Sequence, residues 1–196
     1  DSAALDVTGD IELICYVAAT DWTPAASNII LAKWISTGNQ RSYSLYIGTT
    51  GTIRVDLSVD GTAATAFATA STVAPTVSDG AGLWLRVTVD VDNGAAGKTF
   101  KFYTSTDAVT TAPGSVSWTQ LGSDVTSAGT TSIYVSTAIL EIGTTDTGTQ
   151  TPFTGKIYRA QVYNGIGGTL IEDLDPNNGN SGAATITSVA TGEVYT

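Results

Sequence analysis

The chain has 196 residues, 42% of them hydrophobic, so it is long enough to bury a sizeable core and too apolar to be disordered. Its 18 acidic and 8 basic residues give a net charge of −10, which disfavours binding to a nucleic-acid backbone, and no apolar run approaches the roughly 20 residues that span a bilayer. One cysteine cannot make an internal disulfide, and the absence of histidine excludes a Ser-His-Asp triad within this chain.

Alternation of apolar and polar residues predicts strands in the first half of the chain. Residues 10–19 alternate, with Cys15 in phase with the apolar positions, and residues 27–34 form a second candidate. Residues 41–62 read as a hairpin that turns at 48–51. A second hairpin covers 82–107: Leu83, Leu85 and Val87 share one face, and Trp84 and Arg86 lie on the other.

The second half continues in the same way. Strands are predicted in residues 132–137, 138–144, 155–164, 169–175 and 192–196, whereas the alanine-rich residues 64–74 are expected to form a loop or an edge strand. About ten short strands at even spacing predict an all-β fold, a two-sheet antiparallel β-sandwich of the jelly-roll type. No linker interrupts the pattern, so residues 1–196 are expected to form a single domain. We interpret the chain, which starts at Asp1 without Met, as a segment of a longer or processed chain.

Exposed aromatic rings are the candidates for glycan binding, because the C–H faces of sugars stack on them. Trp22 and Trp118 lie beside turn signals, and Tyr134 is a further candidate. Trp34 and Trp84 lie within strands, where packing in the core with a satisfied indole N–H is the favoured alternative.

Calcium is the only cofactor that the sequence suggests, because this ion prefers oxygen ligands. Asp146 lies in a loop directly after a predicted strand, and Asp92 and Asn93 lie in the turn of the second hairpin. Asp and Asn side chains at such turns more often cap their own backbone than bind metal. The acidic cluster of Glu172, Asp173 and Asp175 is expected to face water at the end of a strand.

The order of these segments resembles laminin-G-like, concanavalin A-like jelly-roll domains, with the nearest similarity to those in structural proteins of tailed bacteriophages. The resemblance rests on the strand "FTGKIYRAQVYN" at 153–164 and on the hairpin "WLRVTVDVDNG" at 84–94, and it covers nearly the whole chain. It implies a sandwich used for binding or virion architecture. The glucanases of this fold carry a Glu-x-Asp-x-x-Glu strand, which this chain lacks, and Glu141 and Asp146 do not replace it. We therefore expect no enzymatic activity.

Two functions remain open. The first is a phage virion structural or adhesion module, such as a capsid decoration, fibre or tail appendage, with other virion subunits, self-association or host-surface glycans as partners. The alternative is a glycan-binding module of a secreted bacterial enzyme or surface protein. Both place the chain on a virion surface or outside the cell, without nucleic acid or membrane insertion. In the resembling domains a further strand usually precedes residues 1–10. We therefore expect the two ends at one sheet edge, which a partner segment completes.

Overall fold

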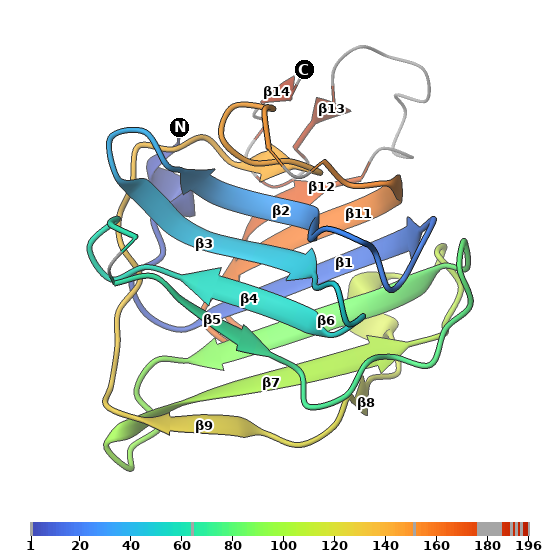
Figure 1. The fold of residues 1–196 in the computed structure, drawn as a ribbon, viewed down its shortest axis with the longest axis horizontal. Coiled ribbons are helices and arrows are strands. Elements are labelled where there is room, and N and C mark those ends of the chain that lie inside the picture. Colours follow the sequence, from blue (N-terminus) through green and yellow to red (C-terminus); the bar gives the residue numbers. More distant parts are fainter. Residues whose placement is uncertain are drawn as a thin grey trace.

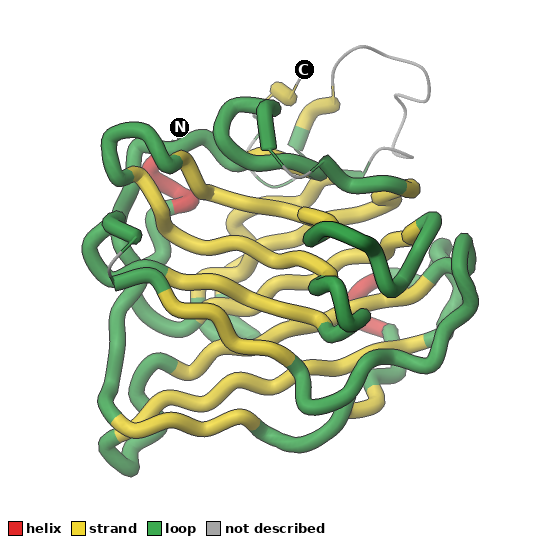
Figure 2. The backbone as a smooth tube through the Cα atoms, in the orientation of Figure 1, coloured by secondary structure: helices red, strands yellow, loops and turns green. Residues whose placement is uncertain are grey.

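The structure is a computed structural model that describes residues 2–63, 65–150, 152–175, 186–188, 190, 192 and 194–195. Its strands form two antiparallel sheets that face one another, as Figure 1 shows, and Figure 2 shows how little of the described chain is helical. The short helices are the 3-10 turns η1 (Ala3–Leu5) and η2 (Pro113–Ser115). No described helix is long and apolar enough to cross a membrane. This architecture confirms the predicted all-β sandwich.

The rear sheet in Figure 1 has the order β12-β11-β1-β6-β7-β8, and β9 also pairs with β7. Its strands are β1 (Ile11–Ala19), β6 (Leu83–Asp90), β7 (Gly97–Ser105), β8 (Thr119–Gln120), β9 (Val125–Ala128), β11 (Gly155–Asn164) and β12 (Thr169–Leu174). The front sheet has the order β10-β2-β3-β4-β5. Its strands are β2 (Asn28–Ile35), β3 (Gln40–Ile47), β4 (Ile53–Leu57), β5 (Phe67–Ala70) and β10 (Glu141–Ile142).

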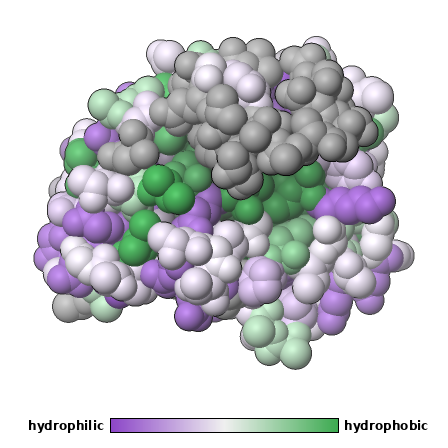
Figure 3. All heavy atoms as spheres, turned by 90° about the horizontal axis from the view of Figure 1, so that it is seen from above, coloured by the Kyte–Doolittle hydropathy of each residue, from purple (hydrophilic) through white to green (hydrophobic). Residues whose placement is uncertain are grey.

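The main core lies between the two sheets and follows the alternation in the sequence. Every second residue of β1, β4 and β6 points inward and is at most 3% exposed. These residues are Ile11, Leu13, Cys15, Val17, Ala19, Ile53, Val55, Leu57, Leu83, Leu85, Val87 and Val89. Figure 3 looks onto the edge that carries β10 and β12, and hydrophobic atoms are visible at its centre between hydrophilic ones.

Both hairpins have the predicted turns. The amide of Gly51 donates to the Gly48 carbonyl at 2.9 Å, and Gly51 has φ +77°, which a residue with a side chain rarely adopts. In the second turn the amide of Asn93 donates to the Gly97 carbonyl at 2.9 Å. The alanine-rich segment contributes β5, an edge strand, as one of the two predicted alternatives.

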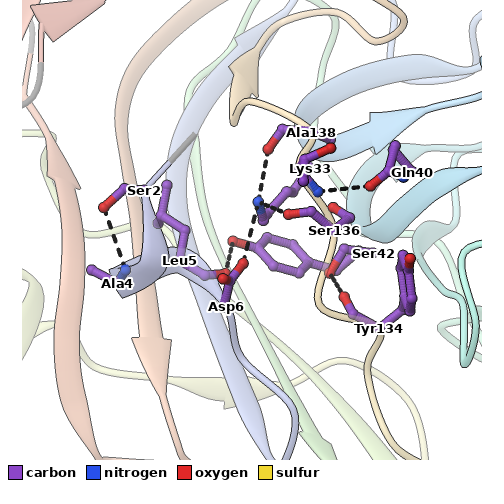
Figure 4. A network of polar contacts seen from close by, with 12 residues as sticks. Ser2, Ala4, Leu5, Asp6, Lys33, Gln40, Ser42, Tyr134, Ser136 and Ala138 are labelled. Atoms are coloured by element: carbon purple, nitrogen blue, oxygen red, sulfur yellow. Dashed lines mark hydrogen bonds and ion pairs between the residues drawn. The ribbon is translucent and has the colours of Figure 1, made fainter. Parts of the chain in front are cut away.

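Residues 131–140 differ from the prediction, because they are extended but form no strand. The amides of residues 131, 133 and 134 donate to backbone carbonyls of Val91, Thr8 and Ser58, and side chains of the front sheet bind several carbonyls of this segment. The Lys33 ammonium donates to the carbonyls of Ser136 and Ala138 at 2.7 Å each, and Ser42 Oγ donates to the Tyr134 carbonyl at 2.7 Å. Figure 4 shows Lys33 reaching between this segment and Asp6, whose carboxylate lies 3.5 Å from Nζ. The segment therefore crosses the end of the sandwich without joining a sheet.

The carboxyl-terminal pairing lies apart from the main sheets. β14 (Val194–Tyr195) pairs with β13 (Ile186–Thr187) in a two-stranded sheet. Completion of an edge by a partner segment stays a prediction, since residues 1, 176–185, 189, 191, 193 and 196 lie outside the described residues.

Candidate functional site

The outward-pointing residues of the seven-stranded sheet form a second cluster that is separate from the main core. Cross-strand pairing places Tyr16 opposite both Trp84 and Arg159, and it places Arg86 opposite both Ile14 and Tyr103. Paired residues point to the same side of a sheet, so these side chains share one surface. We name it the outer aromatic face and define it by Tyr16, Trp84, Arg86, Tyr103, Trp118, Tyr158, Arg159 and Tyr163.

Trp84 is the anchored centre of this face. It is 0% exposed, and its indole N–H donates to the Ala108 carbonyl at 3.2 Å. The ring of Tyr16 packs edge-on against Trp84 at 5.2 Å, and that of Trp118 does so at 6.4 Å, both between ring centroids. Tyr158 extends the row, with its centroid 5.6 Å from that of Tyr16. The outer rings of this row are only partly buried, so solvent reaches Tyr16, Trp118 and Tyr158.

Arg86 is held in place from several sides. Its Nε and Nη2 donate to the two carboxylate oxygens of Glu12 at 2.8 and 3.1 Å, in a bidentate pair. Its guanidinium carbon lies 5.1 Å from the centroid of Tyr103 and 6.0 Å from that of Trp118. Glu12 is fixed in turn, because it also accepts the amide of Gly167 at 2.8 Å. A planar polar group is thus held rigidly beside half-buried rings.

Arg159 forms a second bidentate pair, donating to Asp173 at 3.0 and 2.7 Å, and its Nη1 lies 3.4 Å from Asp175. This corrects the expectation that the acidic cluster faces water, because Glu172 is 0% and Asp173 4% exposed. Asp173 is buried since Arg159 lies beside it on the neighbouring strand. Glu172 points the other way: burial first, and then the charge of Glu172, raise the pKa of the core residue Tyr43.

The three predicted glycan-binding residues lie in different parts of the fold. Trp118 belongs to the outer aromatic face. Trp22 is 4% exposed, with its indole N–H donating to the Ala81 carbonyl at 3.3 Å, so it offers no open ring face, contrary to expectation. Tyr134 lies on the extended segment, where its ring packs against Gly61. Trp84 is buried and its indole N–H is hydrogen-bonded, as expected from the core-packing alternative for this residue.

The hairpin-turn candidates for calcium serve as turn formers. The side-chain oxygen of Asn93 accepts the amides of Ala95 and Gly97 at 3.0 and 3.2 Å, and Asp92 accepts that of Gly94 at 3.3 Å. The side chains at 92–93 are thus engaged with their own backbone.

Asp146 is engaged in the same manner. One carboxylate oxygen accepts the Ser36 amide, and the other accepts Ser36 Oγ at 3.1 Å. Glu141 accepts the amides of Thr147 and Gly148 at 3.1 and 2.7 Å, so both acids tie down the loop. Within the described ranges, no group of three or more His, Cys, Asp or Glu residues could hold a metal ion. Calcium binding at Asp146, Asp92 and Asn93 stays a prediction.

A shallow pocket of about 760 Å³ lies beside this loop. Hydroxyl and amide side chains form much of its wall, which consists of Ile35, Ser36, Thr37, Gln40, Thr137, Asp146, Thr147, Thr149 and Gln150. Several of these groups are already engaged, for example Gln40 Oε1, which accepts the Thr137 amide at 2.7 Å. The pocket contains no aromatic residue, so it lacks the stacking surface that the outer aromatic face provides.

Sequence reasoning named Trp118 as a glycan-binding candidate but assigned no such role to Tyr16, Tyr158, Arg86 and Arg159. A signal was present: the solvent-side positions of β1, β6 and β11 carry aromatic residues and arginine in place of the usual small polar residues. What the sequence did not contain was the order of the strands, which brings residues 16, 84 and 159 into one row.

Comparison with known proteins finds solved structures with a similar fold. No family model matches the chain, and no curated protein is similar to it in sequence. The CBM40 carbohydrate-binding module of the Ruminococcus gnavus IT-sialidase bound to α2,3-sialyllactose is 16% identical, with a TM-score of 0.57 over 84% of this chain and 80% of that one. The same module bound to α2,6-sialyllactose gives a TM-score of 0.53, with 16% identity over 84% and 81% of the two chains.

The leech intramolecular trans-sialidase complexed with 2,7-anhydro-Neu5Ac gives 0.52, with 16% identity over 83% of this chain and 22% of that one. At these identities the similarity establishes the fold alone. The chain therefore has a jelly-roll β-sandwich fold.

Proposed function

We propose that this chain is a non-catalytic glycan-binding module and that its ligand lies on the outer aromatic face. The observation that carries the proposal is the half-buried Trp118 beside Arg86, which a carboxylate and two rings hold in place. Aromatic rings stack on the C–H faces of sugars, and planar donors bind their hydroxyl groups. Because these groups are already ordered, binding costs little side-chain entropy.

The arrangement of the carboxylates supports binding without catalysis. Glycoside hydrolysis needs two carboxyl groups that flank the bond, one of them able to give up a proton. On the outer aromatic face Glu12 and Asp173 are instead each locked in a bidentate pair with an arginine. Neither is presented to a ligand as a free acid or nucleophile.

The solved structures favour the glycan-binding alternative. The two similar Ruminococcus gnavus structures are modules bound to sialyllactose, a glycan ligand. A module of this kind would act outside the cell, where it meets surface or secreted glycans. Display on a phage particle and self-association stay predictions, for which the comparisons give no support; recovery of the chain in stoichiometric amounts with purified virions would favour them.

A glycan array with variants tests the proposal. We expect Trp118→Ala to weaken binding about 30-fold, the loss typical of an aromatic residue at the centre of an interface. Tyr134→Ala removes a ring outside the face and is the matched control, which should bind as the parent does. Far-ultraviolet circular dichroism must show both variants folded, because Trp118 packs on Trp84. If the parent binds no glycan, or if Tyr134→Ala and not Trp118→Ala abolishes binding, the proposal is wrong.

A further inference from the structure

The charges of the outer aromatic face indicate which class of sugar it accepts. We propose that this face selects uncharged saccharides over saccharides that carry a carboxylate, an inference that rests on the proposed function. It separates the ligand of this chain from that of the structurally similar modules, which are bound to the acidic glycan sialyllactose.

The positive charge of Arg86 is largely compensated by Glu12, so Arg86 attracts an anionic ligand only weakly. Two of its nitrogens donate to Glu12, and Tyr103 and Trp118 lie 5.1 and 6.0 Å from its guanidinium carbon. Only 22% of its side chain is exposed. A sugar hydroxyl can still accept a hydrogen bond from such a group, whereas a second carboxylate would compete with Glu12 for one positive charge.

The positive charge of Arg159 is compensated more completely than that of Arg86. Nε and Nη2 donate to Asp173, and Nη1 lies 3.4 Å from Asp175, so all three nitrogens face carboxylates. One guanidinium is thus shared between two acids. A ligand carboxylate placed here would be the third negative group around a single cation, which is unfavourable.

The remaining charges on this side of the sheet do not reverse the balance. Among the described residues, the outward positions of the seven-stranded sheet and the adjoining residues 106–124 and 175 carry four cations and six carboxylates: Arg86, Lys101, Lys156 and Arg159 against Glu12, Asp90, Asp107, Asp124, Asp173 and Asp175. The exposed Lys156, opposite Ala18, lies at one end of the face, and Lys101 is 3.1 Å from Asp124. The whole chain has a net charge of −10, which adds long-range repulsion of anions.

The expected size of the preference follows from one unit charge. Two like charges about 4 Å apart in water repel each other enough to change an equilibrium constant about fivefold, and partial burial increases the effect. We therefore expect each glycan to bind at least fivefold more tightly without its sialic acid. For the neutral form, affinity should be nearly the same at 50 and 500 mM NaCl, because salt screens only interactions between charges.

The experiment uses an array on which every sialylated glycan is printed beside the same glycan after sialidase treatment, with lactose and 3′-sialyllactose as the reference pair. Affinities for the pair are then measured by calorimetry at both salt concentrations. Tighter binding of the neutral members, with little salt dependence, supports the inference. Tighter binding of sialylated members that weakens at 500 mM NaCl overturns the inference and leaves the proposed function standing. Binding of neither member of any pair overturns both.

A charge variant gives a second readout. Asp175→Asn removes one of the two acids at Arg159 and keeps the bidentate Asp173 pair, so the relative affinity for sialylated members should rise about fivefold. Asp92→Asn changes the net charge equally but lies in the hairpin turn, roughly 26 Å along the strand from Trp84, the residue level with Arg159, and should leave the ratio unchanged. Equal responses of the two variants would show that overall charge alone sets the preference, and would overturn the role given to this face.

Discussion

Lys33 should stabilise the fold far more than an exposed lysine with the same contacts. Its side chain is 0% exposed, and its ammonium donates to the carbonyls of Ser136 and Ala138 at 2.7 Å each. Lys33→Met keeps the apolar stem but leaves those two carbonyls without this donor, at about 1–3 kcal/mol each, and it removes the ammonium that lies 3.5 Å from the Asp6 carboxylate. Relief from burying the ammonium offsets part of this cost, so we expect a net loss of about 3 kcal/mol.

Lys98 provides the matched control. Its ammonium also donates to two backbone carbonyls, those of Ala128 and Gly129 at 3.3 and 3.1 Å, but at a site that water reaches. Lys98→Met should therefore cost less than about 1 kcal/mol, because water replaces the lost donor.

Urea unfolding followed by tryptophan fluorescence measures both changes. With a slope of about 2 kcal/mol per molar urea, the midpoint should fall by about 1.5 M for Lys33→Met and by less than about 0.5 M for Lys98→Met. Equal shifts would refute the reasoning, since they would mean that burial adds nothing to the contact. A shift below about 0.5 M for Lys33→Met would also refute it, since the extended segment would then not depend on this side chain.

Three further predictions concern ionisable groups. Burial raises the pKa of Asp56, so ionisation of this carboxyl disfavours the folded state. The stability of the parent relative to the Asp56→Asn variant should therefore increase as the pH falls toward about 4. Thermal unfolding of both proteins from pH 7 to 4 measures this, and a constant difference between them would contradict it. Burial also raises the pKa of the Cys15 thiol, which should react with a thiol reagent only after unfolding; rapid labelling of the native protein would show the thiol to be accessible. Glu141→Gln leaves one oxygen where two now accept the loop amides of residues 147 and 148, and should cost about 1–2 kcal/mol in urea unfolding; an unchanged midpoint would mean that the loop does not depend on Glu141.

The sequence by itself determined the sandwich and most of its inward faces. Alternation in β1, β4 and β6 identifies the residues that point into the core, because successive side chains of a strand point to opposite sides. The turns at Gly48–Gly51 and Asp92–Gly97 follow from residues that tolerate positive φ. These features depend on residues that are close in the sequence, so the sequence alone was sufficient to predict them.

Only the tertiary structure decided which side chains are buried and which of them meet on one surface. Trp22 is buried because Asp79 and Ala81, more than fifty residues later, bind its amide and its indole N–H. Residues 131–140 form no strand, and distant side chains such as Lys33 bind carbonyls that a strand would pair with a neighbouring backbone. The outer aromatic face exists because β1 lies between β6 and β11. Alternation shows which residues share a side of a strand, but strand order, set by packing between distant segments, decides which of them meet.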